Sequence, residues 1–413
     1  MELFTLSNGL RVVAEQLPYL RSVSVGLWMH VGSAMERPEE NGLSHFMEHM
    51  VFKGTERRTT RQIAEEMDAH GGQLNAFTAR DCTCFYAKVI DEDLELAVDM
   101  LSDMALHAAF LPEELEKERG VVLEEIAMDE DSPEDLVGEL LNQAQFAGMP
   151  EGQPILGTAD RLLGYSRDSL VSFRSRHYAP AECVLSVCGS FRPDQLRGLA
   201  EEYLGSWYNQ VQPPRLGTPQ PLRAQRIWRE KDTEQMHLSL GYPGYPYGAD
   251  EGYAAVIMNS VLGGAMSSRL FQRIREELGM AYSIASYPSS MEGSGALCLY
   301  AGVSPKNALQ VLEEMTGQVR LLRDQGMTEK EFREAKNQLR VGFLMGLESP
   351  GSRMQSNGRR QLILGETLEP DQVLAKIEAI TPQAVQAVTE AILSAEPCLS
   401  VVGRGAEKVA KSF

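Results

Sequence analysis

The sequence predicts an α+β protein of two homologous domains, in each of which helices pack on one face of a mainly antiparallel sheet. Three observations support this fold class. The chain has 413 residues, more than one typical hydrophobic core accommodates. Its two halves repeat the same order of strand-like and helix-like segments, and a proline-rich stretch separates them.

The internal repeat is clearest where a strand-like run leads through a turn into an amphipathic helix. Residues 84–98 resemble residues 298–312 in this respect. In both halves a long, Glu-rich helical segment follows and ends near a Ser-Pro pair, at 132–133 and at 349–350. Successive strand-like runs are close enough for hairpins, so the sheets are expected to be mainly antiparallel.

The domain boundary is expected between residues 209 and 225. This stretch contains four prolines and has no helical periodicity, which is typical of a semi-extended linker. We therefore expect an N-terminal domain over 1–208, a linker over 209–225 and a C-terminal domain over 226–413.

Composition and charge exclude some classes of function. The formal net charge of −19 argues against nucleic acid as a partner, although it suits basic peptides, and solubility alone would also explain it. No apolar run reaches the length of a membrane span. The six cysteines form no CxxC pair and fit buried thiols in a reducing compartment. The N-terminus lacks a targeting pattern, so we expect a cytoplasmic protein without a membrane partner.

The sharpest functional signal is a helix predicted over residues 42–54, which Asn41 could cap. On a helical wheel, His45, Glu48 and His49 fall together on one side. The opposite side carries five apolar residues: Leu43, Phe46, Met47, Met50 and Val51. Two histidines four residues apart, roughly 5–6 Å at Cβ, can reach one metal ion. An exposed polar face is the alternative, but the intervening Glu48 favours the inverted zincin motif H-x-x-E-H.

Two histidines leave a catalytic zinc site one protein ligand short. The Glu-rich helix predicted from Pro112 offers candidates. Glu118 and Glu125 are seven residues apart and share one helical face. Composition alone does not choose between the carboxylates of this helix.

The motif His45-Phe-Met-Glu-His49, with Glu125 further along the chain, resembles the pitrilysin (M16) family of zinc metallopeptidases, in its mitochondrial-processing-peptidase-like bacterial branch. The resemblance covers nearly the whole chain. It implies a zinc metalloendopeptidase in which His45, His49 and Glu125 bind Zn²⁺. It further implies that Glu48 is the general base for the attacking water and that Glu118 assists beside the metal ligands.

The same resemblance implies residues that bind an extended peptide substrate. The segment Asn75, Ala76 and Phe77 resembles the family's edge strand, which pairs with the substrate backbone. From the residues alone, an ordinary hairpin strand is the plainer interpretation. Arg275 and Tyr282 match a family pair that holds the substrate and stabilises the oxyanion, although Arg275 could also pair with a neighbouring glutamate.

Two acidic residues, Asp135 and Glu139, fall where processing peptidases recognise a substrate arginine. A solvated acidic loop is the alternative interpretation of these two side chains.

The second half of the repeat lacks the metal motif. Alignment of the halves places Ala255, Met258 and Asn259 opposite His45, Glu48 and His49, and Gly342 opposite Glu125. This pattern resembles the family's pairing of an active and an inactive domain. The family resemblance also implies a homodimer, with a heterodimer as the alternative. The rival function is a non-catalytic or partner-dependent subunit of a heterodimeric processing peptidase.

Overall fold

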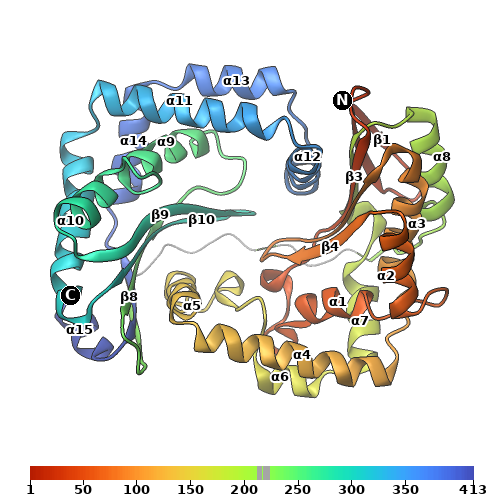
Figure 1. Cartoon of the computed structure of the whole chain (residues 1–413), viewed down its shortest axis with the longest axis horizontal. Coiled ribbons are helices and arrows are strands. Elements are labelled where there is room, and N and C mark those ends of the chain that lie inside the picture. The colour runs from red at the N-terminus through yellow and green to blue at the C-terminus, as the bar shows by residue number, and fades with distance from the viewer. Residues whose placement is uncertain (212–215, 217–223) are drawn as a thin grey trace. The chain divides into compact units, whose positions relative to one another are not determined.

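The computed structural model describes residues 1–211, 216 and 224–413, which form two compact units (Figure 1). Unit 1 comprises Met1–Ile126, Gln153–Leu216 and Leu344–Glu369, and unit 2 comprises Ala127–Gly152, Gly217–Phe343 and Pro370–Phe413. Most of the predicted linker, 209–225, lies outside the described residues. Each unit thus includes a segment from the other half of the sequence, which the division into 1–208 and 226–413 did not anticipate.

Unit 1 contains a six-stranded sheet in the order β1-β2-β6-β3-β5-β4. Its strands are β1 (Glu2–Thr5), β2 (Arg11–Gln16), β3 (Ser22–Met29), β4 (Gln73–Thr78), β5 (Thr83–Ile90) and β6 (Cys183–Gly189). Strands β2 and β6 run parallel, and the other neighbouring pairs are antiparallel. The sheet is therefore mainly antiparallel, as predicted, and β4 forms one of its edges.

In the part of the chain that the structure describes, eight helices belong wholly or mainly to unit 1. They are α1 (Leu43–Val51), α2 (Thr60–Ala69), α3 (Leu94–His107), α4 (Pro112–Asp131), α6 (Ala159–Gly164), α7 (Arg167–His177), α8 (Pro193–Leu204) and α12 (Pro350–Leu364). Single 3₁₀ turns are η1 (Ser33–Met35), η2 (Pro38–Glu40), η3 (Asp91–Asp93) and η5 (Pro180–Glu182).

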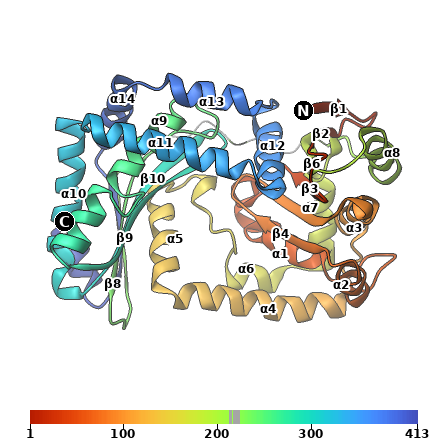
Figure 2. The ribbon, with the colours of Figure 1, turned by 45° about the horizontal axis from the view of Figure 1, so that its top comes forward.

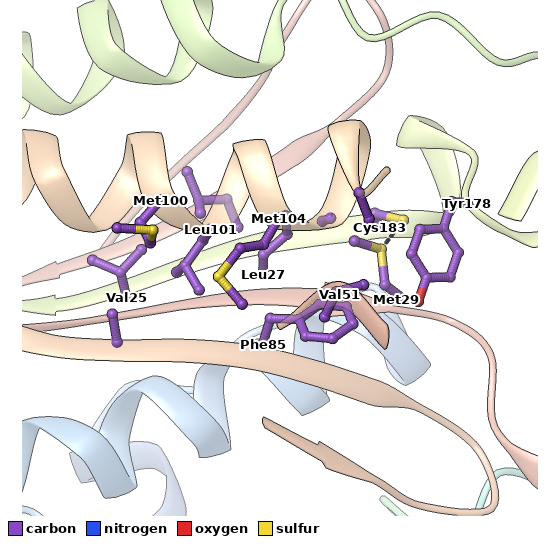
Figure 3. Packing of buried hydrophobic residues seen from close by; sticks show 14 of the residues in the cluster. Val25, Leu27, Met29, Val51, Phe85, Met100, Leu101, Met104, Tyr178 and Cys183 are labelled. Carbon is purple, nitrogen blue, oxygen red and sulfur yellow. Dashed lines mark hydrogen bonds between the residues drawn. The ribbon is translucent and has the colours of Figure 1, made fainter. Parts of the chain in front are cut away.

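The main core of unit 1 lies between the sheet and α3. Alternate residues of β3, including Val25 and Leu27, point to this face, as the two-residue period of a strand requires. Figure 3 shows Met100 and Met104 of α3 packed on these strand residues. All of these side chains are fully buried, so this face supplies much of the apolar burial that stabilises the unit.

The opposite face of the same sheet is covered by α12, which comes from the second half of the sequence. Trp28 points to this side and packs with Met354 of α12. A Cβ atom on Gly358 would lie 2.2 Å from Nε1 of Trp28, so only glycine permits this close approach. The expectation of helices on one face was thus incomplete, because the residues of β3 that alternate with the core positions also need a cover.

Unit 2 repeats this architecture with a five-stranded sheet in the order β7-β11-β8-β10-β9. The order corresponds to β2-β6-β3-β5-β4, so the predicted homology of the two domains is confirmed. Its strands are β7 (Arg226–Glu230), β8 (Met236–Pro243), β9 (Ala281–Met291), β10 (Ser294–Val303) and β11 (Cys398–Gly403).

The helices of unit 2 follow the repeat as well. They are α5 (Pro133–Gln145), α9 (Gly252–Leu262), the π-helix η6 (Phe271–Glu277), α10 (Ala308–Gln325), α11 (Glu329–Gly346), α13 (Pro370–Ala379), α14 (Pro382–Leu393) and α15 (Ala406–Ser412). The 3₁₀ turns η4 (Pro150–Gly152) and η7 (Pro305–Asn307) also belong to it. Among the described residues, none of the helices combines the length and hydropathy that a membrane span requires.

Helices α5 and α12 are exchanged between the two halves of the sequence. Figure 2 shows that α4 leads into α5 and that α11 leads into α12. In unit 2, α5 packs against β8 and β11, and the hydroxyl of Ser400 donates to the carbonyl of Val137 over 2.7 Å. Each long helix therefore carries the chain out of one unit and delivers the next helix to the other.

Candidate active site

Helix α1 presents His45, Glu48 and His49 away from the core. The five apolar residues predicted to face the core are all buried, at 2% exposure or less. Asn41 does not cap the helix, because its side chain donates instead to the carbonyl of Pro154 and to Glu36. The N-cap position is taken by Gly42, whose φ of +97° suits glycine.

The carboxylate of Glu36 supplies the cap that α1 lacks. Its oxygens accept the backbone N–H groups of Gly42 over 2.7 Å and of Ser44 over 2.5 Å. Burial raises the pKa of Glu36 to about 7, although these amide donors act in the opposite direction. Sequence reasoning missed this residue, because a capping carboxylate several positions before a helix leaves no motif.

The structure brings His45, His49 and Glu125 together in unit 1. The Oε2 atom of Glu125 lies 3.7 Å from Nε2 of His45 and 3.4 Å from Nε2 of His49. One ligand atom of each residue lies within 4.8 Å of the other two. Ligands about 2.1 Å from a tetrahedral zinc ion lie roughly 3.4 Å apart, so these spacings fit such an ion.

The bonding state of this cluster also fits a metal ion. Among the described residues, Oε2 of Glu125 is a buried oxygen without a hydrogen-bond donor. A buried, unpartnered carboxylate oxygen is costly, and it faces two imidazole nitrogens that can point their lone pairs at the same place. Two imidazoles and one carboxylate are a donor set typical of catalytic zinc.

Glu118 orients His49 from behind. Its Oε1 lies 2.8 Å from Nδ1 of His49, and its Oε2 accepts from Nζ of Lys53 over 2.7 Å. A hydrogen bond at Nδ1 leaves Nε2 free to face Glu125. Burial raises the pKa of Glu118, but the hydrogen bonds from His49 and Lys53 outweigh it, so the pKa is lowered overall.

The two histidines differ in their titration. Burial lowers the pKa of His45 to about 4, with a smaller contribution from neighbouring His49. Burial also lowers the pKa of His49, but the hydrogen bond to Glu118 and the nearby carboxylates more than offset it, so that pKa is raised. Neutral imidazole is the form that binds a metal, and His45 is held in that form by its surroundings.

Glu48 is tied to the edge of the sheet. Its carboxylate accepts a short hydrogen bond from the hydroxyl of Thr78, the last residue of β4. Burial raises the pKa of Glu48, and the hydrogen bond from Thr78 lowers it by less. A carboxylate with a raised pKa at this position is suited to accept and return a proton.

The residues predicted to bind substrate lie on β4, which is an edge strand. Among the described residues, β4 pairs with β5 on one side and with no strand on the other. Asn75 is exposed, and its side chain accepts the backbone N–H of Ala76 over 2.8 Å. Phe77 packs edge-on against Trp28 at 5.5 Å between ring centroids. The strand thus offers one unpaired edge beside α1.

Arg275 and Tyr282 lie together in unit 2. The guanidinium carbon of Arg275 is 5.8 Å from the ring centroid of Tyr282 and 5.0 Å from that of Phe271. Tyr282 is 75% exposed at the start of β9. The alternative partner of Arg275, Glu276, is only loosely paired at 3.9 Å.

Asp135 and Glu139 lie one turn apart on α5 in unit 2. Asp135 is exposed, and its backbone N–H donates a hydrogen bond over 3.4 Å to the hydroxyl of Ser132, the N-cap residue of α5. The segment is helical rather than a loop, and it begins with the Ser-Pro pair seen in the sequence.

The described residues of the second half carry no matching cluster. His45, His49 and Glu125 form the one group of three metal-binding side chains found in the described part of the chain. On α9, the side-chain oxygen of Asn259 accepts a hydrogen bond over 2.7 Å from the hydroxyl of buried Ser286. This bond to the neighbouring strand β9 accounts for a polar residue at this position.

Comparison with known proteins is consistent with these observations. A family model described as insulinase, peptidase family M16, matches residues 11–159, and one described as the peptidase M16 inactive domain matches residues 164–339. An uncharacterized zinc protease of Bacillus subtilis is 40% identical over 97% of this chain and 97% of its own length. A second, from Streptomyces coelicolor, is 39% identical over 97% of this chain and 88% of its length.

Solved structures share the fold. A protease from Helicobacter pylori has a TM-score of 0.89 with 20% identity, over 97% of this chain and 99% of that one. A peptidase M16 inactive domain from Pseudomonas fluorescens has a TM-score of 0.89 with 16% identity, over 98% of this chain and 97% of that one. The chain therefore belongs to peptidase family M16, as its motifs predicted.

Proposed function

We propose that this chain is a zinc-dependent endopeptidase that hydrolyses unfolded peptides or oligopeptides. The observation that carries the proposal is the cluster of His45, His49 and Glu125, with a buried carboxylate oxygen facing two imidazole nitrogens. The names of its relatives as zinc proteases support the choice of metal. When bound, Zn²⁺ supplies a Lewis acid that polarises a peptide carbonyl and acidifies water.

In this proposal the protein's own residues position the reactants and move the proton. His45, His49 and Glu125 hold the ion, and Glu118 fixes the ring of His49. Glu48 takes a proton from the attacking water and returns it to the leaving amine. The hydroxyl of Thr78 keeps the carboxylate of Glu48 in place for both transfers.

Substrate binding is proposed to use the edge of the sheet. An extended peptide would pair with the free side of β4 at Asn75, Ala76 and Phe77, so that backbone hydrogen bonds give affinity with little sequence preference. The side chain of Asn75 would have to release the N–H of Ala76 when the peptide arrives.

The remaining assignments are proposals on the same footing. Arg275 and Tyr282 are proposed to contact the substrate and stabilise the oxyanion, and their mutual packing supports treating them as one pair. Asp135 and Glu139 are proposed to attract a basic substrate residue. Peptides with and without arginine near the cleavage site test this, and equal turnover of both would contradict it.

We further propose a homodimer, which sedimentation of the purified chain tests.

Metal analysis and a cleavage map on a peptide library test the central proposal. The purified chain should contain about one zinc per molecule and cleave unfolded peptides, and a chelator should stop cleavage. Glu48→Gln should keep the metal and lose turnover by about 10²–10⁴-fold. If the isolated chain binds zinc but cleaves nothing, the rival function as a non-catalytic or partner-dependent subunit would be favoured.

A further inference from the structure

His45 and His49 are oriented by different means. His49 has a carboxylate behind its ring, because Glu118 bonds its Nδ1 over 2.8 Å. Among the described residues, Nδ1 of His45 is buried and has no such partner. In the described part of the chain, therefore, no side-chain hydrogen bond at Nδ1 fixes the ring of His45. The position of the ring must depend on the position of the backbone of His45.

The backbone amides just before His45 are held by the buried side chain of Glu36. This carboxylate is 4% exposed and accepts from Gly42, from Ser44 and from the side chain of Asn41, over 2.7, 2.5 and 3.1 Å. Ser44 immediately precedes His45. The first N–H groups of a helix have no partner within the helix, and a carboxylate is favoured there by the helix dipole.

The surroundings leave the first turn of α1 little freedom to find another cap. Gly42 provides no side chain, and Asn41 is committed to the carbonyl of Pro154 over 2.8 Å. A Cβ atom on Gly157 would lie 2.7 Å from Cα of Gly42, so the two backbones are in direct contact. Glu36 is therefore the component of this packing that determines where the first turn sits.

We infer that Glu36 is a positioning residue for the proposed metal site, which sets the place of His45 through the amides of Gly42 and Ser44. The inference rests on the proposed function, because it assigns Glu36 a purpose beyond stability. Replacing one carboxylate oxygen with an amide nitrogen would turn a donor toward the helix amides. The first turn, and His45 with it, would then shift.

The test measures zinc affinity by chelator competition on folded Glu36→Gln, alongside thermal unfolding. We expect zinc to bind about 10–100-fold more weakly, the range for losing a supporting partner of a metal ligand. With zinc restored in excess, KM for peptide should match that of the unchanged protein. A shorter variant, Glu36→Asp, keeps the charge, and its zinc affinity should fall between that of Glu36→Gln and that of the unchanged protein. This variant serves as the test if Glu36→Gln does not fold.

Thr59→Ala is the matched control. Thr59 caps α2, which carries none of the site residues, through a reciprocal capping box. This variant should unfold at a lower temperature yet bind zinc normally. Normal zinc affinity in Glu36→Gln or, where that variant does not fold, in Glu36→Asp would overturn the inference while leaving the proposed function intact. A parallel loss of affinity in Thr59→Ala would also overturn it. Failure of the unchanged protein to bind zinc would overturn both.

Discussion

At the residue scale, the site depends on pairs in which one side chain fixes another. Lys53, Glu118 and His49 form a chain of hydrogen bonds that ends at Nδ1 of His49, whose Nε2 faces Glu125. Glu118 is 5% exposed, so its charge is compensated mainly by these two neighbours. The sequence placed Glu118 near the site by family resemblance, whereas Lys53 gave no signal, because a lysine at a helix end is usually a surface residue.

Glu118→Gln should weaken zinc binding without abolishing it. The amide keeps the size of the side chain but removes the negative charge that orients His49 and pairs with Lys53. We expect a loss of about 10–100-fold in zinc affinity, as is usual for the partner of a metal-binding histidine. Chelator competition measures this, and Glu124→Gln, on the exposed side of the same helix, is the control. Equal affinity in the two variants would contradict the assigned role of Glu118.

A second residue-scale prediction concerns buried Asp103, which accepts from Arg57, Arg58 and Thr55. Burial raises the pKa of Asp103, but these hydrogen bonds outweigh it and lower the pKa overall. A carboxyl group whose pKa is lowered on folding stabilises the protein above its unfolded pKa of about 3.9. That contribution is lost as the pH falls through the lower folded pKa.

Asp103→Asn should therefore reduce the free energy of unfolding at neutral pH by about 1–3 kcal/mol, because it removes the charged acceptor shared by these donors, although Arg58 keeps Asp99 and Glu66. The difference between variant and unchanged protein should shrink as the pH falls below about 3.9, because Asp103 takes up its proton in the unfolded state first. Urea unfolding at pH 7 and near pH 3 measures both effects. Glu65→Gln, which breaks an exposed pair with Arg61, should change stability by less than about 1 kcal/mol at either pH.

At the scale of elements, α12 shows how closely a helix can approach a sheet. Glycines on both sides allow the contact, since a Cβ atom on Gly26 would meet the sulfur of Met354 at 2.3 Å. Arg353 and Asn357 of α12 also pair with Glu15 of β2. The helix is therefore docked by shape and by charge on the face that α3 leaves open.

Gly358→Ala should destabilise the fold although alanine favours helices. The added methyl group would lie 2.2–2.7 Å from three atoms of the buried indole of Trp28, which has no room to move. Overpacking of this kind costs about 1–3 kcal/mol. Gly351→Ala in the same helix meets nothing closer than 3.7 Å and should be tolerated. Thermal unfolding of both variants decides, and a stable Gly358→Ala would show that α12 can shift.

The elements also show what could be predicted from the sequence. Helix α1 was predictable because its apolar residues follow a period of 3.6. The mainly antiparallel sheets were predictable because successive strand-like runs are close enough for hairpins. The exchange of α5 and α12 was not, because a helix pattern states which face is apolar and not which sheet covers it. Glu36 escaped notice for a related reason, since its partners are backbone amides that any sequence provides.

At the scale of the whole molecule, the two repeated halves share a fold, whereas the candidate metal ligands lie in one of them. Both halves build the same sheet order, yet the proposed metal-binding cluster lies in unit 1 and joins α1 to α4. These two helices are far apart in the sequence and meet through His49, Glu118 and Glu125. A ligand that binds only the folded arrangement must therefore raise the stability of the unit that contains it.

Zinc removal should accordingly lower the unfolding temperature of the unchanged protein. Free zinc at 100 times its Kd stabilises the folded state by about 2.7 kcal/mol, and the effect should grow with zinc concentration. Differential scanning calorimetry with zinc and with chelator measures the shift. His45→Ala, which removes one ligand, should unfold at nearly the same temperature under both conditions. An equal zinc-dependent shift in both proteins would mean that the ion binds elsewhere, because α1 and α4 would then not be joined through His45.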